Sequence, residues 1–246
     1  ALKLMKENNI DIKNVIVHAP YIINLANDEN KEKYLFAIDF LKDEIKRVEK
    51  FGIEKLVLHP GSYTTLDIDM GIKCIINALN EVLKDDFTVS ILLETMAGKG
   101  TEVGFKLEHI KRIIDGVSNS QRLMVCLDTC HLNDAGYDMS NFDCFLDEFD
   151  NIIGIEKIGC IHVNDSKNIL SSHKDRHENI GYGTIGFQNL INIIYDDRLK
   201  DVPKILETPF VKDRLYPPYK FEIEEIKNKT FNVNLYEDII NYYEKK

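Results

Sequence analysis

The stretch LMVCLDTCHLNDAGYD, residues 123–138, joins an apolar run to a dense group of polar residues. Within Cys126–Asp134 stand two cysteines, two aspartates and a histidine. An apolar run that ends in an aspartate is typical of a buried β-strand whose C-terminal end reaches the edge of the sheet where functional sites form. Taken alone, the group fits a zinc knuckle, a redox pair, or a metal site whose ligands are not the cysteines. The rest of the chain is needed to choose among them.

Five other short apolar or β-branched runs share the pattern of residues 123–128. They are NVIVH (14–18), KLVLH (55–59), VSILLE (89–94), GCIHVND (159–165) and VPKILE (202–207). Each run predicts a strand that is buried on both faces. The segments between them have helical periodicity, as in residues 41–52, where Leu41, Ile45 and Val48 share one face and a glycine follows as a stop. This alternation predicts repeated βα units and a parallel sheet.

Residues of metal-ligand type stand at or near the end of all six predicted strands. They are His18, His59, Glu94, Asp128, His162 and Glu207, with successive gaps of 41, 35, 34, 34 and 45 residues. Each gap matches one βα unit, so a parallel barrel would bring the six side chains to its C-terminal rim, where barrel enzymes build their sites. A strand-end aspartate often caps the next helix, but that explanation does not extend to six successive strand ends. The pattern predicts a functional site.

The barrel predicted from this chain is incomplete. A closed barrel of this class needs eight strands, and six are visible in 246 residues. We therefore expect two further βα units ahead of Ala1, with ALKLMKEN (1–8) as the tail of the second helix. From Tyr216 to Lys246 we predict a loop, a polar linker and a final helix, LYEDIINYYEKK (235–246). The length and the 44% content of hydrophobic residues predict a single domain over residues 1–246.

Composition and charge exclude several classes of protein. No run approaches the roughly 18 uninterrupted apolar residues of a membrane span, and the first residues do not resemble a signal peptide. The five cysteines are odd in number and scattered, which favours a reduced, intracellular compartment. The net charge of -10 argues against a broad electrostatic grip on nucleic acid. If DNA is the partner, bound metal would have to supply positive charge locally.

Three further candidate ligands lie beside the six. They are His131, three residues after Asp128, and the pair Asp175 and His177 in HKDRHENIGYGTIG (173–186). A set of His, Asp and Glu without cysteine suits zinc in a hydrolytic site rather than a structural one. Nine ligands are too many for one metal but suffice for three if a carboxylate bridges. Closely spaced metals of this kind clamp the attacking and leaving oxygens of a phosphodiester displacement.

Seven motifs follow one another along the chain: HAPYIINLAN (18–27), HPGSY (59–63), ETMAGKGTEVGF (94–105), CLDTCHLNDAGYD (126–138), HVNDSK (162–167), DRHENIGYGTIG (175–186) and ILET (205–208). With these motifs, in that family's order, the chain resembles the endonuclease IV family of apurinic/apyrimidinic endonucleases over about Val15 to Glu207. The resemblance implies an α/β fold, the xylose isomerase-like TIM barrel, with residues 217–246 as a divergent C-terminal loop and helix. It implies an enzyme that incises DNA 5′ to abasic sites, leaving a 3′-hydroxyl and a 5′-deoxyribose phosphate, and removes 3′-blocking groups.

The resemblance also implies three Zn²⁺ per chain, with Mn²⁺ as an alternative at one site. The implied ligands are His18, His59 and a bridging Glu94 for the first zinc, Glu94, Asp128, His162 and Glu207 for the second, and His131, Asp175 and His177 for the third. Glu94 and Glu207 are the implied catalytic residues, which orient or deprotonate the attacking water. Three Zn²⁺ would add +6 to the net charge of -10 and leave -4, with the positive charge where a phosphate must sit.

The implied partner is double-stranded DNA that contains abasic sites or 3′-blocked ends. Tyr21 and Ile22 match the positions from which the family inserts side chains into the minor groove, which bends the duplex and exposes a flipped sugar. The alternative is that both residues only pack at the rim. The family also inserts an arginine from a loop after its second strand, which precedes the region matched here. A monomer without a membrane partner, acting in base excision repair in the cytoplasm, nucleus or a DNA-containing organelle, is expected.

Two other functions remain open from the sequence. Sugar isomerases and epimerases of the same barrel superfamily hold one or two divalent metals with a set like Glu94, Asp128, His162 and Glu207. That function leaves the other ligands unexplained, namely His18, His59, His131, Asp175 and His177. A catalytically silent protein that binds abasic DNA would keep all nine residues without turnover.

Several conspicuous residues are predicted to have no catalytic role. Cys126 and Cys130 are predicted to be small packing residues. His109, in the amphipathic segment 106–115, is predicted to be solvated. The glycine-rich segment IGYGTIG (180–186) lacks the spacing of a phosphate-binding loop, and its glycines are predicted to form tight turns.

Overall fold

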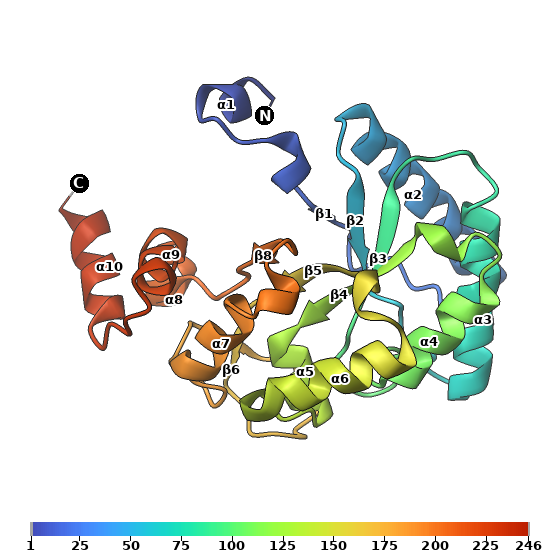
Figure 1. Ribbon diagram of the computed structural model, residues 1–246. Helices are drawn as coiled ribbons and strands as arrows, with labels where there is room; N and C mark the ends of the chain where they lie inside the picture. Colours follow the sequence, from blue (N-terminus) through green and yellow to red (C-terminus); the bar gives the residue numbers. More distant parts are fainter. Residues whose placement is uncertain (1, 246) are drawn as a thin grey trace.

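The computed structural model describes residues 2–245, and a parallel six-stranded sheet lies at its centre (Figure 1). The strands, in their order across the sheet, are β1 (Val17–His18), β2 (Lys55–Leu58), β3 (Ser90–Glu94), β4 (Leu123–Asp128), β5 (Ile158–His162) and β8 (Lys204–Ile205). All six predicted strands are confirmed, although most are shorter than the predicted runs. Two short strands, β6 (Asp165–Ser166) and β7 (His177–Glu178), pair antiparallel to each other.

The helices are α1 (Leu2–Glu7), α2 (Lys31–Lys50), α3 (Ile68–Val82), α4 (Leu107–Gly116), α5 (Thr129–Ala135), α6 (Phe142–Ile152), α7 (Phe187–Ile194), α8 (Val211–Arg214), α9 (Tyr219–Asn228) and α10 (Leu235–Glu244). Those between β1 and β8 cover the outside of the curved sheet, whereas α1 and the group α8–α10 lie apart from it (Figure 1). Short 3-10 helices lie at Ile12–Asn14, Ser120–Arg122, Met139–Asn141, Ile155–Lys157 and Asp197–Leu199. No helix within residues 2–245 is long and apolar enough to cross a membrane.

Helix α2 forms as its periodicity predicts. Leu41, Ile45 and Val48 are buried on its inner face, and Asn30 caps its start by accepting a hydrogen bond from a backbone N–H of the first turn. The helix ends at Lys50, two residues before Gly52, whose φ of +79° belongs to the left-handed region that favours glycine. The predicted βα repeat is therefore confirmed in detail at this unit.

The inner face of the sheet explains why the polar strand ends meet. Val57, Leu92, Cys126 and Cys160 form one buried cluster on that face, one residue from each of four neighbouring strands. Successive strand residues point to opposite faces, so the residue two positions further along returns to the inner face. Those residues are His59, Glu94, Asp128 and His162. A buried apolar layer therefore lies directly beneath a polar one.

The two ends of the sheet are β1 and β8. Within residues 2–245 neither strand pairs with a further strand, and the two do not pair with each other. The expectation of two more βα units ahead of Ala1 is not tested by this arrangement and stays a prediction. The helix predicted at residues 1–8 is confirmed as α1 for its described part, while Ala1 and Lys246 lie outside the described residues.

The prediction of a loop and a polar linker after Tyr216 is wrong over α9. This helix was missed because the residues it buries are Glu222 and Glu225 instead of apolar side chains. The carboxylate of Glu222 accepts hydrogen bonds from Asn179 Nδ2 at 2.9 Å and from the backbone N–H of Ile180 at 3.1 Å. Polar contacts of this kind leave no hydrophobic periodicity to detect. The final helix is confirmed as α10.

Candidate metal centre

The C-terminal ends of the parallel strands carry the predicted ligands to one place. Four of the nine end a strand, His59 follows β2 directly and Glu207 lies two residues beyond β8. Of the remaining three, one comes from α5, one from the segment before β7 and one from β7 itself. The structure brings them together in three neighbouring groups, of which the first two share Glu94: His18, His59 and Glu94; Glu94, Asp128, His162 and Glu207; and His131, Asp175 and His177. Within each group the ligand atoms all lie within 4.8 Å of one another.

Glu94 lies at the centre of the site and is fully buried. Its Oε2 lies 3.0 Å from His18 Nε2 and 3.1 Å from His59 Nε2. Its Oε1 lies 3.1 Å from His162 Nδ1 and 3.5 Å from His131 Nδ1. Burial alone would raise the pKa of Glu94, but the neighbouring histidines, His162 foremost, hold it well below its usual range. A carboxylate in this position is shared between groups.

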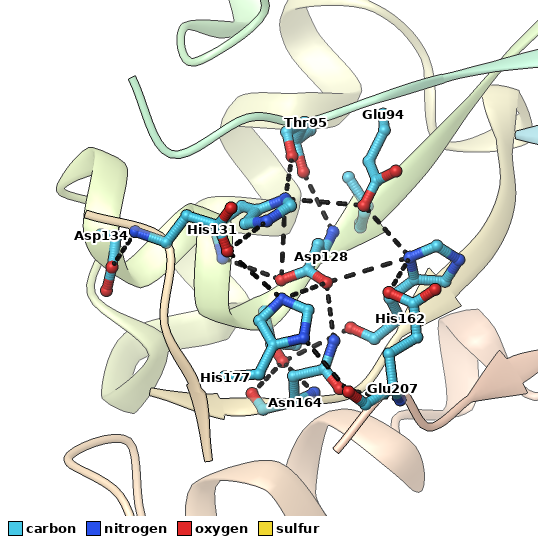
Figure 2. Close-up of polar contacts among 12 residues, drawn as sticks. Glu94, Thr95, Asp128, His131, Asp134, His162, Asn164, His177 and Glu207 are labelled. Carbon is cyan, nitrogen blue, oxygen red and sulfur yellow. Dashed lines mark hydrogen bonds and ion pairs between the residues drawn. The ribbon is translucent and has the colours of Figure 1, made fainter. Parts of the chain in front are cut away.

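The second group places three carboxylates around His162 (Figure 2). His162 Nδ1 lies 3.1 Å from Glu207 Oε2 and 3.9 Å from Asp128 Oδ2. Burial would lower the pKa of His162, but Glu94 and its other neighbours raise it instead. Asp128 is fully buried, whereas 34% of the Glu207 side chain is exposed. Such a concentration of buried negative charge requires a compensating cation.

The third group contains a buried nitrogen without a partner. His131 Nε2 lies 3.2 Å from Asp175 Oδ1, and His177 Nε2 lies 3.6 Å from the same oxygen and 3.7 Å from Asp128 Oδ2. His177 Nε2 is buried and has no hydrogen-bond partner among the described residues. Buried polar atoms are rarely left unpaired. A buried imidazole nitrogen that faces two carboxylates is the arrangement expected of side chains that bind a cation together.

Three of the histidines are oriented in the manner of metal ligands. The Nδ1 atoms of His18, His131 and His177 contact backbone carbonyl oxygens at 2.7, 2.9 and 3.3 Å. A carbonyl oxygen only accepts, so each Nδ1 carries the proton and each Nε2 keeps its lone pair. Those Nε2 atoms face the carboxylates of the site. Imidazole nitrogens and carboxylate oxygens without thiolate fit zinc in a catalytic site.

A pocket of about 280 Å³ opens onto the three groups and is lined by Tyr21, Glu94, Asp175 and Glu207 among others. A larger pocket of about 590 Å³ lies beside Ile22 and α2, but none of the nine residues lines it. The smaller pocket is the better candidate for the substrate, because the titratable side chains converge there.

Tyr21 and Ile22 stand at the edge of these pockets. They follow β1 in the chain, and their exposed fractions are 89% and 67%. Among the described residues they are therefore not packed into the rim, which removes the support for a purely structural role. Their role in DNA binding stays a prediction.

Comparisons with known proteins place the chain in a family. Residues 1–229 match the family model described as a xylose isomerase-like TIM barrel. The chain is 54% identical over 243 residues to a probable endonuclease 4 of Bacillus cytotoxicus, covering 96% of this chain and 80% of the relative. It is 53% identical over 235 residues to a probable endonuclease 4 of Pediococcus pentosaceus, covering 94% and 79%. This chain belongs to the endonuclease IV family.

Solved structures extend the likeness to three dimensions. Endonuclease IV from Thermus thermophilus matches with a TM-score of 0.75 at 29% identity, covering 92% of this chain and 78% of that one. A D-tagatose 3-epimerase-like protein matches with a TM-score of 0.69 at 21% identity, covering 98% and 82%, which shows the fold alone. The predicted α/β barrel fold is confirmed. As a member of the endonuclease IV family, the chain is a nuclease, an enzyme that hydrolyses phosphodiester bonds.

Asn164 positions two candidate ligands in this family member, although no role was predicted for it. It is fully buried, donates from Nδ2 to Asp128 Oδ2 at 2.7 Å, and accepts the backbone N–H of Glu207 at 2.9 Å (Figure 2). Thr95 adds a second support, since its hydroxyl accepts the backbone N–H of Asp128 at 3.0 Å. Such partners fix the orientation of metal ligands. Asn164 lies in the quoted motif HVNDSK, which was the signal that could have found it.

Asp134, near the end of α5, holds the loop that carries Asp175. Its fully buried carboxylate accepts hydrogen bonds from Ser166 Oγ at 2.7 Å, Asn168 Nδ2 at 2.8 Å and the backbone N–H of Asp175 at 2.9 Å. Asp175 has a φ of +57°, an uncommon conformation for a residue with a side chain. Because His131 lies about one turn earlier on the same helix, α5 supplies one member of the third group and positions another.

The glycine-rich segment 180–186 surrounds a carboxylate of the chain itself. Asp165 accepts hydrogen bonds from the backbone N–H groups of Gly181, Gly183, Ile185 and Gly186. Gly181 and Gly186 both have a φ of +84°, so the predicted tight turns are confirmed. The N–H groups that a phosphate-binding loop would offer to a ligand are already used by Asp165.

The prediction that His109 is solvated is wrong. The residue is only 8% exposed, its Nδ1 accepts the backbone N–H of Gly104 at 3.4 Å, and its ring packs edge-on against Phe105. Burial, the largest influence, lowers its pKa. It belongs to none of the three groups, so its role is structural. Cys126 and Cys130 are fully buried, as predicted.

Proposed function

We propose that this member of the endonuclease IV family is a zinc-dependent DNA repair endonuclease that acts as a monomer inside the cell. It hydrolyses the phosphodiester bond 5′ to an abasic site, leaving a 3′-hydroxyl and a 5′-deoxyribose phosphate, and it removes 3′-blocking groups. The observation that supports this most strongly is the convergence of nine His, Asp and Glu residues, in three neighbouring groups, at one open pocket.

Three zinc ions match the donor set, with Mn²⁺ as an alternative at one site. The proposed ligands are His18, His59 and Glu94 for one ion, Glu94, Asp128, His162 and Glu207 for another, and His131, Asp175 and His177 for the last. When bound, zinc supplies Lewis-acid charge to the phosphate and lowers the pKa of nearby water. The chain needs that charge locally, because its net charge of -10 would otherwise repel the DNA backbone.

Glu94 and Glu207 are the proposed catalytic residues. Both line the pocket, so both can contact a substrate or a water molecule there. Glu94 is held rigidly by its histidine partners and orients the water, while the more exposed Glu207 has room to accept the proton. The water oxygen bonds to phosphorus as its proton passes to Glu207, the bond between phosphorus and the 3′ oxygen breaks, and the 3′ oxygen takes up a proton from solvent to become the hydroxyl.

Tyr21 and Ile22 are the proposed contacts to the damaged duplex. An exposed aromatic ring and an exposed branched side chain beside the catalytic pocket are suited to enter the minor groove and fill the space next to a missing base. The absence of a base lowers the cost of flipping the sugar into the pocket. This arrangement selects abasic DNA over intact duplex.

The metal content gives the first test. We expect about three zinc ions per chain by elemental analysis of the purified protein, because one ion occupies each group of ligands. Incision of a duplex with one abasic site should stop on addition of a strong chelator and return with added zinc. One tightly bound ion per chain, or manganese as the main metal, would contradict the three-zinc proposal. Zinc-loaded protein that binds the duplex without cutting it would indicate a silent binding protein.

The exposed aromatic residue gives the second test. Tyr21→Ala should weaken binding of abasic duplex by about 10-fold, because an inserted or stacked ring contributes roughly 1–3 kcal/mol. Its zinc content should not change. Phe51→Ala is a matched control, because Phe51 is also an exposed aromatic residue but lies just after the C-terminal end of α2 and does not line the pocket. Equal losses of zinc and of DNA affinity in Tyr21→Ala would assign Tyr21 a structural role instead.

A further inference from the structure

Two thiols lie side by side beneath the candidate metal centre. Cys126 of β4 and Cys160 of β5 are partners in the strand register, and Asp128 and His162 are partners two residues further along the same strands. Residues two apart on a strand point to the same face. The two strands therefore present two pairs of side chains to the inside of the sheet. The upper pair, Asp128 and His162, offers a carboxylate and an imidazole, and the lower pair, Cys126 and Cys160, offers two sulfur atoms.

We propose that Cys126, Cys160 and His162 form a second binding site, which shares His162 with the candidate metal centre, for a thiophilic divalent d¹⁰ cation of the class of Cd²⁺. Their ligand atoms all lie within 4.8 Å of one another. Three donors at that spacing can converge on one ion at metal–sulfur distances of about 2.3 Å. Two sulfurs and one imidazole nitrogen are soft donors that favour such ions over Mg²⁺ or Ca²⁺.

Burial and charge are consistent with this site. Cys126 and Cys160 are fully buried, in a cluster with Val57 and Leu92. A charge in such surroundings must be compensated. Binding releases the two thiol protons to solvent, and the two thiolates then neutralise a divalent cation completely.

The remaining cysteines do not offer the same donor set. Cys130 shares a group with Asp128 and His177, but that group holds a single sulfur. Cys74 is buried on α3 and belongs to none of the ligand groups found in residues 2–245, and Cys144 is exposed. The pair on β4 and β5 therefore provides the one two-sulfur group within the described residues.

The site has a consequence for the centre above it. His162 belongs to both groups, and its Nδ1 lies 3.1 Å from Glu94 and from Glu207. A cation bound by the two cysteines also uses the His162 side chain, so its binding is coupled to metal binding by the oxygen- and nitrogen-rich group. A thiophilic metal bound here therefore affects the zinc that His162 is proposed to hold.

Cadmium titration followed by ultraviolet absorption tests the proposal. The signal reports on bonds between sulfur and cadmium and does not depend on enzyme activity. The starting protein is the full, zinc-loaded chain with Cys144→Ala, which removes the exposed thiol. Added Cd²⁺ should produce the ultraviolet thiolate-to-cadmium charge-transfer band, which nitrogen and oxygen ligands do not give. Cys126→Ala and Cys160→Ala, each in that background, should lose the band. Cys130→Ala is the matched control, equally buried and beside Asp128, and should keep it.

The result that overturns the proposal is equally specific. No band in the starting protein, an undiminished band in Cys160→Ala, or loss of the band in Cys130→Ala would each exclude the site. Circular dichroism and a cooperative thermal transition establish that each variant is folded. If Cys160→Ala is unfolded, Cys160→Val restores the lost volume with a side chain that binds no metal, and its titration is read in the same way.

Discussion

Replacing Glu94 by glutamine should reduce incision of abasic duplex by at least ~10³-fold, because loss of a mere supporting partner of a metal ligand already costs roughly 10–100-fold. Glu94 faces four histidine nitrogens with its two oxygens. Glutamine keeps the shape but loses the charge, and its NH₂ group would face histidine nitrogens. Binding of abasic duplex should remain measurable, since Tyr21 and Ile22 are not touched by the change.

The measurement combines single-turnover incision, fluorescence anisotropy with labelled duplex, and zinc analysis. Glu49→Gln is a suitable control, because Glu49 is an α2 carboxylate that accepts hydrogen bonds from Thr88 far from the pocket. It should cut at the normal rate. Normal cleavage by Glu94→Gln would refute the proposed mechanism, whereas loss of zinc from all three groups at once would show that Glu94 assembles the whole centre.

Asp134→Asn should release the third group while leaving the other two in place. An amide offers one accepting oxygen where the carboxylate offers two, and its NH₂ would face the donors on Asn168 or Asp175. Unsatisfied buried donors cost roughly 1–3 kcal/mol each, so the free energy of unfolding should fall by about 2–4 kcal/mol. With the loop no longer held, zinc should fall from about three to about two ions per chain, because His131 and His177 without a positioned Asp175 do not retain the third.

Zinc content and a denaturant titration of the same preparation measure both effects. Asp138→Asn is the matched control: Asp138 also lies close to the end of α5, but its carboxylate serves only the exposed Ser140. That variant should keep its zinc and most of its stability. An Asp134→Asn protein with an unchanged zinc content and an unchanged unfolding midpoint would mean that other contacts hold the loop.

Strand periodicity accounts for most of what could be predicted from the sequence. A strand that is buried on both faces is a run of apolar residues, which is easily recognised, and each such run here ends in or near a residue that binds metals well. Val57 and His59, or Leu92 and Glu94, differ by two positions, so the same face that buries the first presents the second. The convergence of the polar residues then follows from the geometry of parallel strands.

Contacts made through polar atoms account for the rest. Helix α9 was not predicted because it buries glutamates that accept hydrogen bonds from distant segments. His109 was misjudged because its partners, Gly104 and Phe105, are set by how the loop folds back onto α4. Asn164 likewise gains its role from Glu207, which is 43 residues away in the chain. Tertiary hydrogen bonds of this kind have no period in the sequence.

Helix α5 limits how the length of this chain can vary. Asp128 caps the helix by accepting the backbone N–H of His131, and Asp134 follows after another three residues. One residue inserted between them would rotate every later side chain by about 100° around the helix axis. Asp134 would then face away from the loop that carries Asp175. The third group of ligands would no longer be aligned with the second, to which Asp128 belongs. Apart from Asp128, His131 and Asp134, the segment 128–134 should therefore tolerate substitution far better than any insertion or deletion.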